Sequence, residues 1–272
     1  MRKIILFGSN GMLGNYINSY LCDKYHVIPL TRDDLDISLN SDDDILKFIK
    51  SYVDNNSIII NACGIIKQRG YNSIDMIKVN SLFPHLLSKI KDEIGCQVVH
   101  ITTDCVFNGI IGSYSEGDIH DAHDDYGKSK SLGEPKNTTN IRTSIIGEEK
   151  LNKKSLLEWV KSKEQYSVIE GYINHKWNGL TCLELSKVID NIITENNFWV
   201  GTRHIHSPDT VTKYDLVYSI NEIYKLNLKI RPTRTTTHCY RNLISNYSSI
   251  VKKSIYEQIV ETYEFNLKNL NK

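Results

Sequence analysis

The sequence has almost no net charge, because 33 Lys and Arg residues balance 32 Asp and Glu residues to a formal +1. The basic residues are scattered along the chain and form no stripe. This pattern argues against nucleic acid or an anionic membrane surface as a partner. The sequence also lacks any apolar run near the roughly 20 residues that span a bilayer. We therefore expect neither a nucleic-acid partner nor a membrane partner.

Cysteines are few and lack metal-binding spacing. The six cysteines stand at positions 22, 63, 96, 105, 182 and 239, and no two of them form a C-x-x-C pair. Zinc and redox motifs need such spacing, so we predict no metal site. The apolar run near the N-terminus is too short for a signal peptide and ends in a glycine-rich turn. Reduced thiols in a cytoplasmic protein are the expectation.

Internal repeats and low-complexity linkers are also absent, so any second domain is predicted to be interwoven with the first. Short apolar runs alternate with amphipathic stretches through the first half. They predict strands at 3–7, 26–30, 57–62 and 97–102, and helices at 13–20, 43–53 and 74–90, the last starting or kinking at Pro84. Continuous apolar strands separated by helices predict an α/β fold with a Rossmann-type, doubly wound parallel sheet.

The second half is less regular. A polar, acidic stretch at 108–125 reads as a long loop, and loops of that length are usually functional. After it we expect a helix from Tyr126, strands at 140–146, 203–206 and 228–231, and helices at 156–161, 182–194, 213–224 and 254–263.

The stretch FGSNGMLG carries Gly8, Gly11 and Gly14 between a predicted strand and a predicted helix. Glycines at this spacing permit a tight turn, a close approach of a pyrophosphate, and packing of the helix on the strand. The context predicts a dinucleotide site. The residues expected to contact the cofactor here are Gly8, Ser9, Asn10, Gly11, Met12 and Leu13.

Two further strand ends extend this predicted cofactor site. In LTRDDLDI, Arg32 would bind a 2′-phosphate, and Asp36 and Ile37 would flank the adenine. Because Arg32 comes first, NADPH is favoured over NADH, although Arg32 and Asp33 could equally be solvent-facing turn residues. In NACG, small residues allow the backbone to pass close to the cofactor; these are Ala62, Cys63 and Gly64.

The stretch DYGKSK places Tyr126 and Lys130 four residues apart at a helix start, so both side chains share one helical face. A lysine ammonium near a phenol stabilises the phenolate and lowers the pKa of the tyrosine. The spacing therefore predicts a proton-transfer pair.

Together, GSNGMLG, TTDCVFNG, YGKSKSLGE and IRTSIIG resemble the extended short-chain dehydrogenase/reductase superfamily, and within it the dTDP-4-dehydrorhamnose reductase family. The stretches NACGIIKQ, VNSLFPHLL and TTDCVF are similar to a subgroup that makes UDP-N-acetyl-L-rhamnosamine for surface polysaccharides. The resemblance implies reduction of a UDP- or dTDP-linked 4-keto-6-deoxy sugar by NADPH, and a homodimer. It also implies an NADP-binding domain over 1–147, completed by about 173–206, and a smaller α/β nucleotide-sugar domain over 148–172 and 207–272.

The same resemblance assigns roles to individual residues. Thr103 would hydrogen-bond the C4 oxygen of the sugar, and Tyr126 would deliver a proton to that oxygen. Lys130 would hold the nicotinamide ribose and lower the pKa of Tyr126. Thr102 would lie beside the cofactor. Arginine and lysine suit a diphosphate, and an aromatic face suits uracil. Other substrate contacts are therefore predicted at Lys67, Arg69, Asp104, Cys105, Val106, Trp159, His175, Lys176, Trp177 and Arg241.

Cys105 leaves two alternatives open. Side chains alternate along a strand, so Thr103 and Cys105 would point the same way if the strand stays extended. Plain rhamnose reductases usually carry tyrosine at this position, and the related GDP-fucose synthases carry a cysteine that acts in epimerisation. Cys105 is then either an epimerase acid/base, with His175 or Lys176 as partner, or a small residue that leaves room for a 2-acetamido group.

Two rival functions follow from the same scaffold. An epimerase or dehydratase that recycles NAD is one, although a dehydratase would carry a glutamate where Cys105 stands. A non-catalytic NADP-binding regulatory subunit is the other, and the intact set of Thr103, Tyr126 and Lys130 argues against it.

Overall fold

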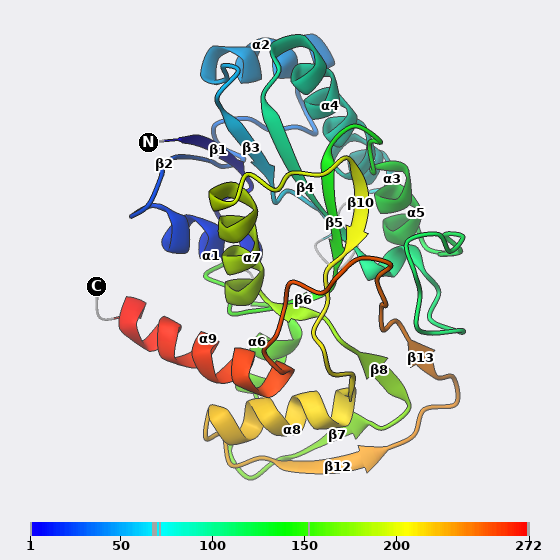
Figure 1. Ribbon diagram of the computed structural model, residues 1–272. Coiled ribbons are helices and arrows are strands. Elements are labelled where there is room, and N and C mark those ends of the chain that lie inside the picture. The colour runs from blue at the N-terminus through cyan, green and yellow to red at the C-terminus, as the bar shows by residue number, and fades with distance from the viewer. Residues whose placement is uncertain (1, 67–69, 71, 152, 271–272) are drawn as a thin grey trace.

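A six-stranded parallel sheet forms the centre of the computed structural model, which describes residues 2–66, 70, 72–151 and 153–270 (Figure 1). Its strands in spatial order are β2 (His26–Leu30), β1 (Lys3–Phe7), β3 (Ile58–Asn61), β4 (Gln97–Thr103), β5 (Thr139–Thr143) and β10 (Gly201–His204). The interior strands are buried along their length because helices cover both faces. The predicted α/β, doubly wound fold is confirmed.

Two apolar layers sandwich this sheet (Figure 1). Helices α1 (Met12–Leu21) and α7 (Cys182–Thr194) pack on one face. Helices α2 (Asp42–Tyr52) and α4 (Phe83–Ile94) pack on the other, where Ile45, Leu46 and Ile49 of α2 are buried as its 3.6-residue period predicts.

The helix expected at 74–90 is interrupted. It consists of α3 (Ser73–Met76), a π-helical turn (Ile77–Leu82) and then α4. Pro84 cannot donate the backbone hydrogen bond that a continuous α-helix needs, which favours the wider turn before it. Asn80 in this turn is fully buried, and its side chain bonds the backbone of Ile65 at both N and O.

Short strands and three helices lie beyond the carboxyl ends of the central strands (Figure 1). The helices are α6 (Leu156–Lys161), α8 (Lys213–Ile223) and α9 (Ile255–Leu270), whose apolar faces share one core cluster. The strands pair as β7 (Val168–Tyr172) with β12 (Lys229–Thr233), β6 (Ile145–Ile146) with β9 (Leu180–Thr181), and β11 (Val211–Thr212) with β8 (His175–Trp177) and β13 (Cys239–Tyr240). The strand expected at 140–146 is split in two at Ser144, and α9 runs further than expected.

None of the helices in the described part of the chain combines the length and apolar character needed to cross a membrane.

Candidate active site

The strand order reverses between β1 and β3, and ligands of doubly wound sheets bind at such a point, beyond the carboxyl ends of the strands. Gly8 follows β1 with a φ of +79°, which glycine adopts without strain. Helix α1 starts at Met12 after Gly11, and among the described residues no side chain caps it and no acid lies in its first turn. Its N–H groups and dipole therefore suit an anion such as a pyrophosphate.

A cavity of about 310 Å³ lies beside this glycine turn. Of the residues predicted to bind the cofactor, it brings together Gly8, Asn10, Gly11, Arg32, Asp36, Ile37, Ala62, Cys63 and Gly64. Arg32 Nε lies 2.7 Å from Asp36 Oδ2, and Arg32 also donates to the Ser38 hydroxyl. Ser9 does not line this cavity, and its hydroxyl donates to the Leu30 carbonyl at 3.0 Å.

A second cavity, of about 350 Å³, shares Gly11 and residues 62–64 with the first. Its other walls include the remaining predicted residues Met12, Leu13, Thr102, Thr103, Asp104, Cys105, Tyr126 and Lys130. Thr102 donates its hydroxyl hydrogen to Glu134, so this hydroxyl is already used within the protein. The predicted proton-transfer residues thus lie beside the predicted nicotinamide end of the cofactor site.

The strand argument for Cys105 is wrong in its premise, because β4 ends at Thr103. A 3-10 turn follows over Asp104–Val106, and the Thr103 hydroxyl accepts a hydrogen bond from the Cys105 N–H at 3.1 Å. The turn still brings the Cys105 side chain to the same cavity as Thr103. Val106, in contrast, is fully buried in a cluster with Phe107. It therefore cannot contact a sugar, contrary to the prediction.

Helix α5 (Asp125–Leu132) carries the tyrosine and the lysine. Asp124 caps it by accepting from the Gly127 N–H at 2.9 Å. Gly127 permits very close packing on the turn over Asp104–Val106, since an added Cβ would lie 2.3 Å from the Cys105 carbonyl oxygen. This contact fixes Tyr126 over the turn that holds Cys105.

Protonation in this corner is governed by burial. Burial and the nearby Cys105 raise the pKa of Tyr126, whereas the lysine was expected to lower it. The buried Lys130 donates to the Ile101 carbonyl at 3.2 Å, and burial lowers its pKa to about 8. The phenol of Tyr126 is therefore protonated near neutral pH and suited to donate a proton.

Cys105 is also protonated. Burial, reinforced by Asp104, raises the pKa of its thiol to about 12. Arg241 opposes this shift and donates from Nη1 to the Cys105 sulfur at 3.4 Å. The guanidinium of Arg241, a predicted substrate residue, thus contacts Cys105, which lines the cavity.

The predicted aromatic contacts fall elsewhere. Trp177 is only 3% exposed, its indole N–H donates to the Ser144 hydroxyl, and the Lys213 ammonium lies 5.1 Å from its ring centroid. It therefore has no open face for a nucleobase, contrary to expectation. Trp159 lines a separate surface depression together with Lys163.

Two of the predicted substrate residues, His175 and Lys176, do not line the second cavity. His175 Nε2 lies 2.9 Å from the Thr235 hydroxyl, and the Lys176 ammonium lies 4.9 Å from the ring centroid of Tyr240. Burial lowers the pKa of His175. Lys67 and Arg69 lie outside the described residues.

Sequence reasoning missed one whole wall of the second cavity. It is formed after β5 by Ser144, Ile145, Glu149, Lys154, Ser155 and Leu156. A usable signal existed, because the carboxyl end of β5 lies at the same sheet edge as those of β1, β3 and β4. Lys213 was also missed. Burial lowers the pKa of its ammonium group, and the nearby Asp104 and Cys105 oppose this shift. Among the described residues no cluster of His, Cys, Asp or Glu is arranged to hold a metal ion.

Comparisons with known proteins agree with this geometry. The spore coat polysaccharide biosynthesis protein SpsK of Bacillus subtilis is 25% identical over 268 residues, or 94% of this chain and 92% of that protein. A solved dTDP-4-dehydrorhamnose reductase from Clostridium acetobutylicum superposes with a TM-score of 0.80 at 22% identity, covering 97% of this chain and 99% of that one. One from Bacillus anthracis, in complex with NADP, has a TM-score of 0.79 at 18% identity over the same shares.

The family model described as RmlD substrate binding domain matches residues 1–269, which is nearly the whole chain. The resemblance inferred from the motifs is therefore confirmed at the level of the family. This chain belongs to the RmlD substrate-binding-domain family.

Proposed function

We propose that this protein is an NADPH-dependent 4-keto reductase of a nucleotide-linked 6-deoxy sugar. The observation that carries the proposal is the convergence of Thr103, Tyr126 and Lys130 on a cavity that continues into the glycine-loop cavity. Family membership and the names of the solved relatives support the same reaction.

The side chains divide the chemistry in a simple way. NADPH supplies a hydride to C4 when it is bound. The Tyr126 phenol donates its proton to the C4 oxygen, and the Thr103 hydroxyl holds that oxygen in place. Lys130 binds the nicotinamide ribose. One hydride and one proton convert the ketone to an alcohol, and the tyrosine recovers its proton from solvent.

The cofactor loop supports NADPH through Arg32, which lies at the first cavity with its side chain 54% exposed beside Ser38. We expect Arg32→Ala to lower kcat/KM for NADPH by about 10- to 100-fold and to change the value for NADH only a few-fold, because only NADPH carries the 2′-phosphate. Initial rates with both cofactors measure the ratio. Arg231→Ala, which removes an exposed arginine paired with Glu170, is the matched control. An unchanged cofactor preference in Arg32→Ala would assign the 2′-phosphate to other residues.

For the substrate, we propose a UDP-linked sugar with a 2-acetamido group, giving UDP-N-acetyl-L-rhamnosamine for polysaccharide synthesis. The subgroup motifs, the small Cys105 at the cavity wall and the likeness to SpsK support this choice. A dTDP-4-dehydrorhamnose reductase is the second candidate, favoured by the names of the solved relatives. We also propose the domain division 1–147 with 173–206, and 148–172 with 207–272; the presence of β10 in the central sheet supports it. A homodimer stays a prediction.

Cys105, we propose, shapes the pocket and does not epimerise the sugar. Its side chain lines the cavity, its sulfur accepts a hydrogen bond from Arg241 Nη1, and burial raises the pKa of its thiol. NADPH oxidation with UDP- and dTDP-linked 4-keto-6-deoxy sugars, with and without a 2-acetamido group, tests both proposals in deuterated water. We expect turnover without solvent deuterium at C3 or C5 beyond a no-enzyme control. Cys105→Ser should keep the rate with an already epimerised substrate within about threefold.

The other outcomes are equally informative. Deuterium at C3 or C5 that disappears in Cys105→Ser would make this cysteine an epimerase group. No turnover with any of the sugars would overturn the reductase and revive the regulatory alternative.

A further inference from the structure

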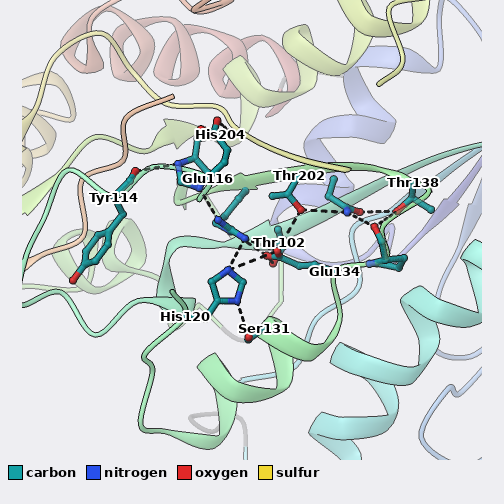
Figure 2. A network of polar contacts seen from close by, with 12 residues as sticks. Thr102, Tyr114, Glu116, His120, Ser131, Glu134, Thr138, Thr202 and His204 are labelled. Atoms are coloured by element: carbon teal, nitrogen blue, oxygen red, sulfur yellow. Dashed lines mark hydrogen bonds and ion pairs between the residues drawn. The ribbon is translucent and has the colours of Figure 1, made fainter. Parts of the chain in front are cut away.

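A buried polar cluster surrounds Arg142 of β5, which precedes Thr143 at the wall of the second cavity. Figure 2 labels its members His120, Glu134 and His204. Arg142 is 2% exposed, and its guanidinium forms an ion pair with both oxygens of Glu134. Its Nη1 lies 2.7 Å from His204 Nε2, and its Nη2 lies 2.7 Å from His120 Nε2. One buried guanidinium thus bonds one carboxylate and two imidazoles.

The contacts determine the protonation of both histidines. A guanidinium has only donors, so each Nε2 must accept and each imidazole must be neutral with its proton on Nδ1. His120 Nδ1 lies 2.6 Å from the Ser131 hydroxyl. His204 Nδ1 lies 2.8 Å from the Ile244 carbonyl and 3.1 Å from the Tyr114 carbonyl, both of which accept. Protonation of either ring would remove the acceptor that Arg142 uses.

One side of the cluster contacts the residues around the turn over Asp104–Val106. Glu134 accepts from the Thr102 hydroxyl at 2.9 Å, directly before Thr103. His120 belongs to the loop 108–124, and the next two backbone N–H groups of that loop donate to the Val106 carbonyl in the turn that holds Cys105. His120 therefore anchors the loop where it meets the turn over Asp104–Val106.

The other side leads to the segment 241–246. His204 Nδ1 donates to the Ile244 carbonyl of this segment, and Glu116 accepts from the backbone N–H groups of both His204 and Asn246. Figure 2 shows Glu116 beside His204. This segment begins with Arg241, which donates to the Cys105 sulfur and to the Phe107 carbonyl. His204 is thus bonded to the same short segment that carries Arg241 to the cavity wall.

We propose that Arg142 and the neutral imidazoles of His120 and His204 form a positioning unit for the nucleotide-sugar. The unit fixes the loop 108–124 and the segment 241–246 against the substrate cavity, and protonation of either imidazole releases its segment. This inference rests on the proposed function, since the positioned ligand is the nucleotide-sugar.

The surroundings of the two rings set the direction of the pH effect. His120 faces Arg142, Glu134 and Asp121; burial and then Arg142 lower its pKa, and the two acids oppose the shift. His204 faces Arg142 and Glu116; burial and then Arg142 lower its pKa to about 4. Both rings are therefore neutral at pH 7. His120 takes up a proton only at a pH below the ordinary value of 6.5, and His204 only near pH 4.

Steady-state kinetics with saturating NADPH test the unit between pH 4 and 7.5, a range that reaches the pKa of His204. We expect the KM for the nucleotide-sugar to rise about fivefold at the acid end in the wild-type protein, while the Kd for NADPH changes less than twofold. The double variant His120→Gln/His204→Gln keeps a neutral acceptor near each Nε2 and cannot titrate, so its KM should not vary with pH. His26→Gln, at an exposed position of β2, is the matched control and should keep the wild-type rise.

Arg142→Lys tests the role of the Arg142 guanidinium at pH 7.5. Lysine keeps the charge but lacks the planar fork that reaches Glu134 and both imidazoles together. We expect the KM for the nucleotide-sugar to rise about tenfold and kcat to change less than threefold. A KM within twofold of wild type, or an acid rise that persists in the double glutamine variant, would overturn the proposal. If Arg142→Lys does not fold, the glutamine variant decides.

Hydrogen exchange provides a readout that needs no turnover. Corrected for intrinsic rates, exchange of backbone amides in 108–124 and 241–246 should be faster at pH 4 than at pH 7.5 in the wild-type protein, and equal at both pH values in the glutamine variant. If no 4-keto sugar is turned over, the proposed function fails while this experiment still tests the release of the two segments. Equal protection of both segments at both pH values in the wild-type protein would contradict the inference.

Discussion

Tyr126→Phe is expected to lower kcat for the nucleotide-sugar by about 10²- to 10⁴-fold, the range that a positioned general acid contributes. The phenol lies at the cavity next to Thr103, and burial raises its pKa, so it holds a proton for the C4 oxygen near neutral pH. Phenylalanine keeps the ring and its packing on α5 and removes only the donor. The Kd for NADPH, measured by fluorescence titration, should change less than about threefold.

Tyr218→Phe is the matched control, since Tyr218 lies on α8 with half of its side chain exposed. It should retain wild-type kcat and KM. Near-normal turnover by Tyr126→Phe would show that the proton comes from another group, and the Thr103 hydroxyl would then be the first candidate to examine.

Gly14→Ala is expected to weaken NADPH binding by at least about 100-fold, the second large effect. An added Cβ at Gly14 would lie 2.1 Å from the Gly8 carbonyl oxygen and 2.8 Å from the Ser9 Cα. These neighbours are backbone atoms, so the glycine turn itself must move, and overpacking of this kind costs roughly 1–3 kcal/mol or more. A displaced turn can no longer present its N–H groups to the pyrophosphate. An NADPH titration measures the loss of affinity. Thermal unfolding with and without NADPH measures the loss of stability.

Gly117→Ala provides the comparison, because an added Cβ there would meet no atom within 4 Å. It should bind NADPH as the wild type does. Unchanged NADPH affinity in Gly14→Ala would mean that the turn between β1 and α1 does not hold the pyrophosphate, and the cofactor assignment of the whole loop would have to be revised.

Local sequence signals account for much of the agreement between expectation and structure. The apolar runs at 3–7 and 97–102 formed buried strands within one residue of the predicted ends. Helices such as α7 were recognised because their apolar residues recur with the helical period. The strands β6, β9, β11 and β13 are only two residues long, and so short a segment has no period to detect.

The sequence by itself determined the doubly wound sheet, the glycine turn, and the pairing of Tyr126 with Lys130 on one helical face, because each depends on residues close together in the chain. Tertiary structure alone decided the turn after Thr103, the burial of Trp177 and the wall formed by 144–156. It also decided the raised pKa of Tyr126 and the grouping of two histidines around Arg142. These features depend on burial and on contacts between segments far apart in the chain, which no local pattern encodes.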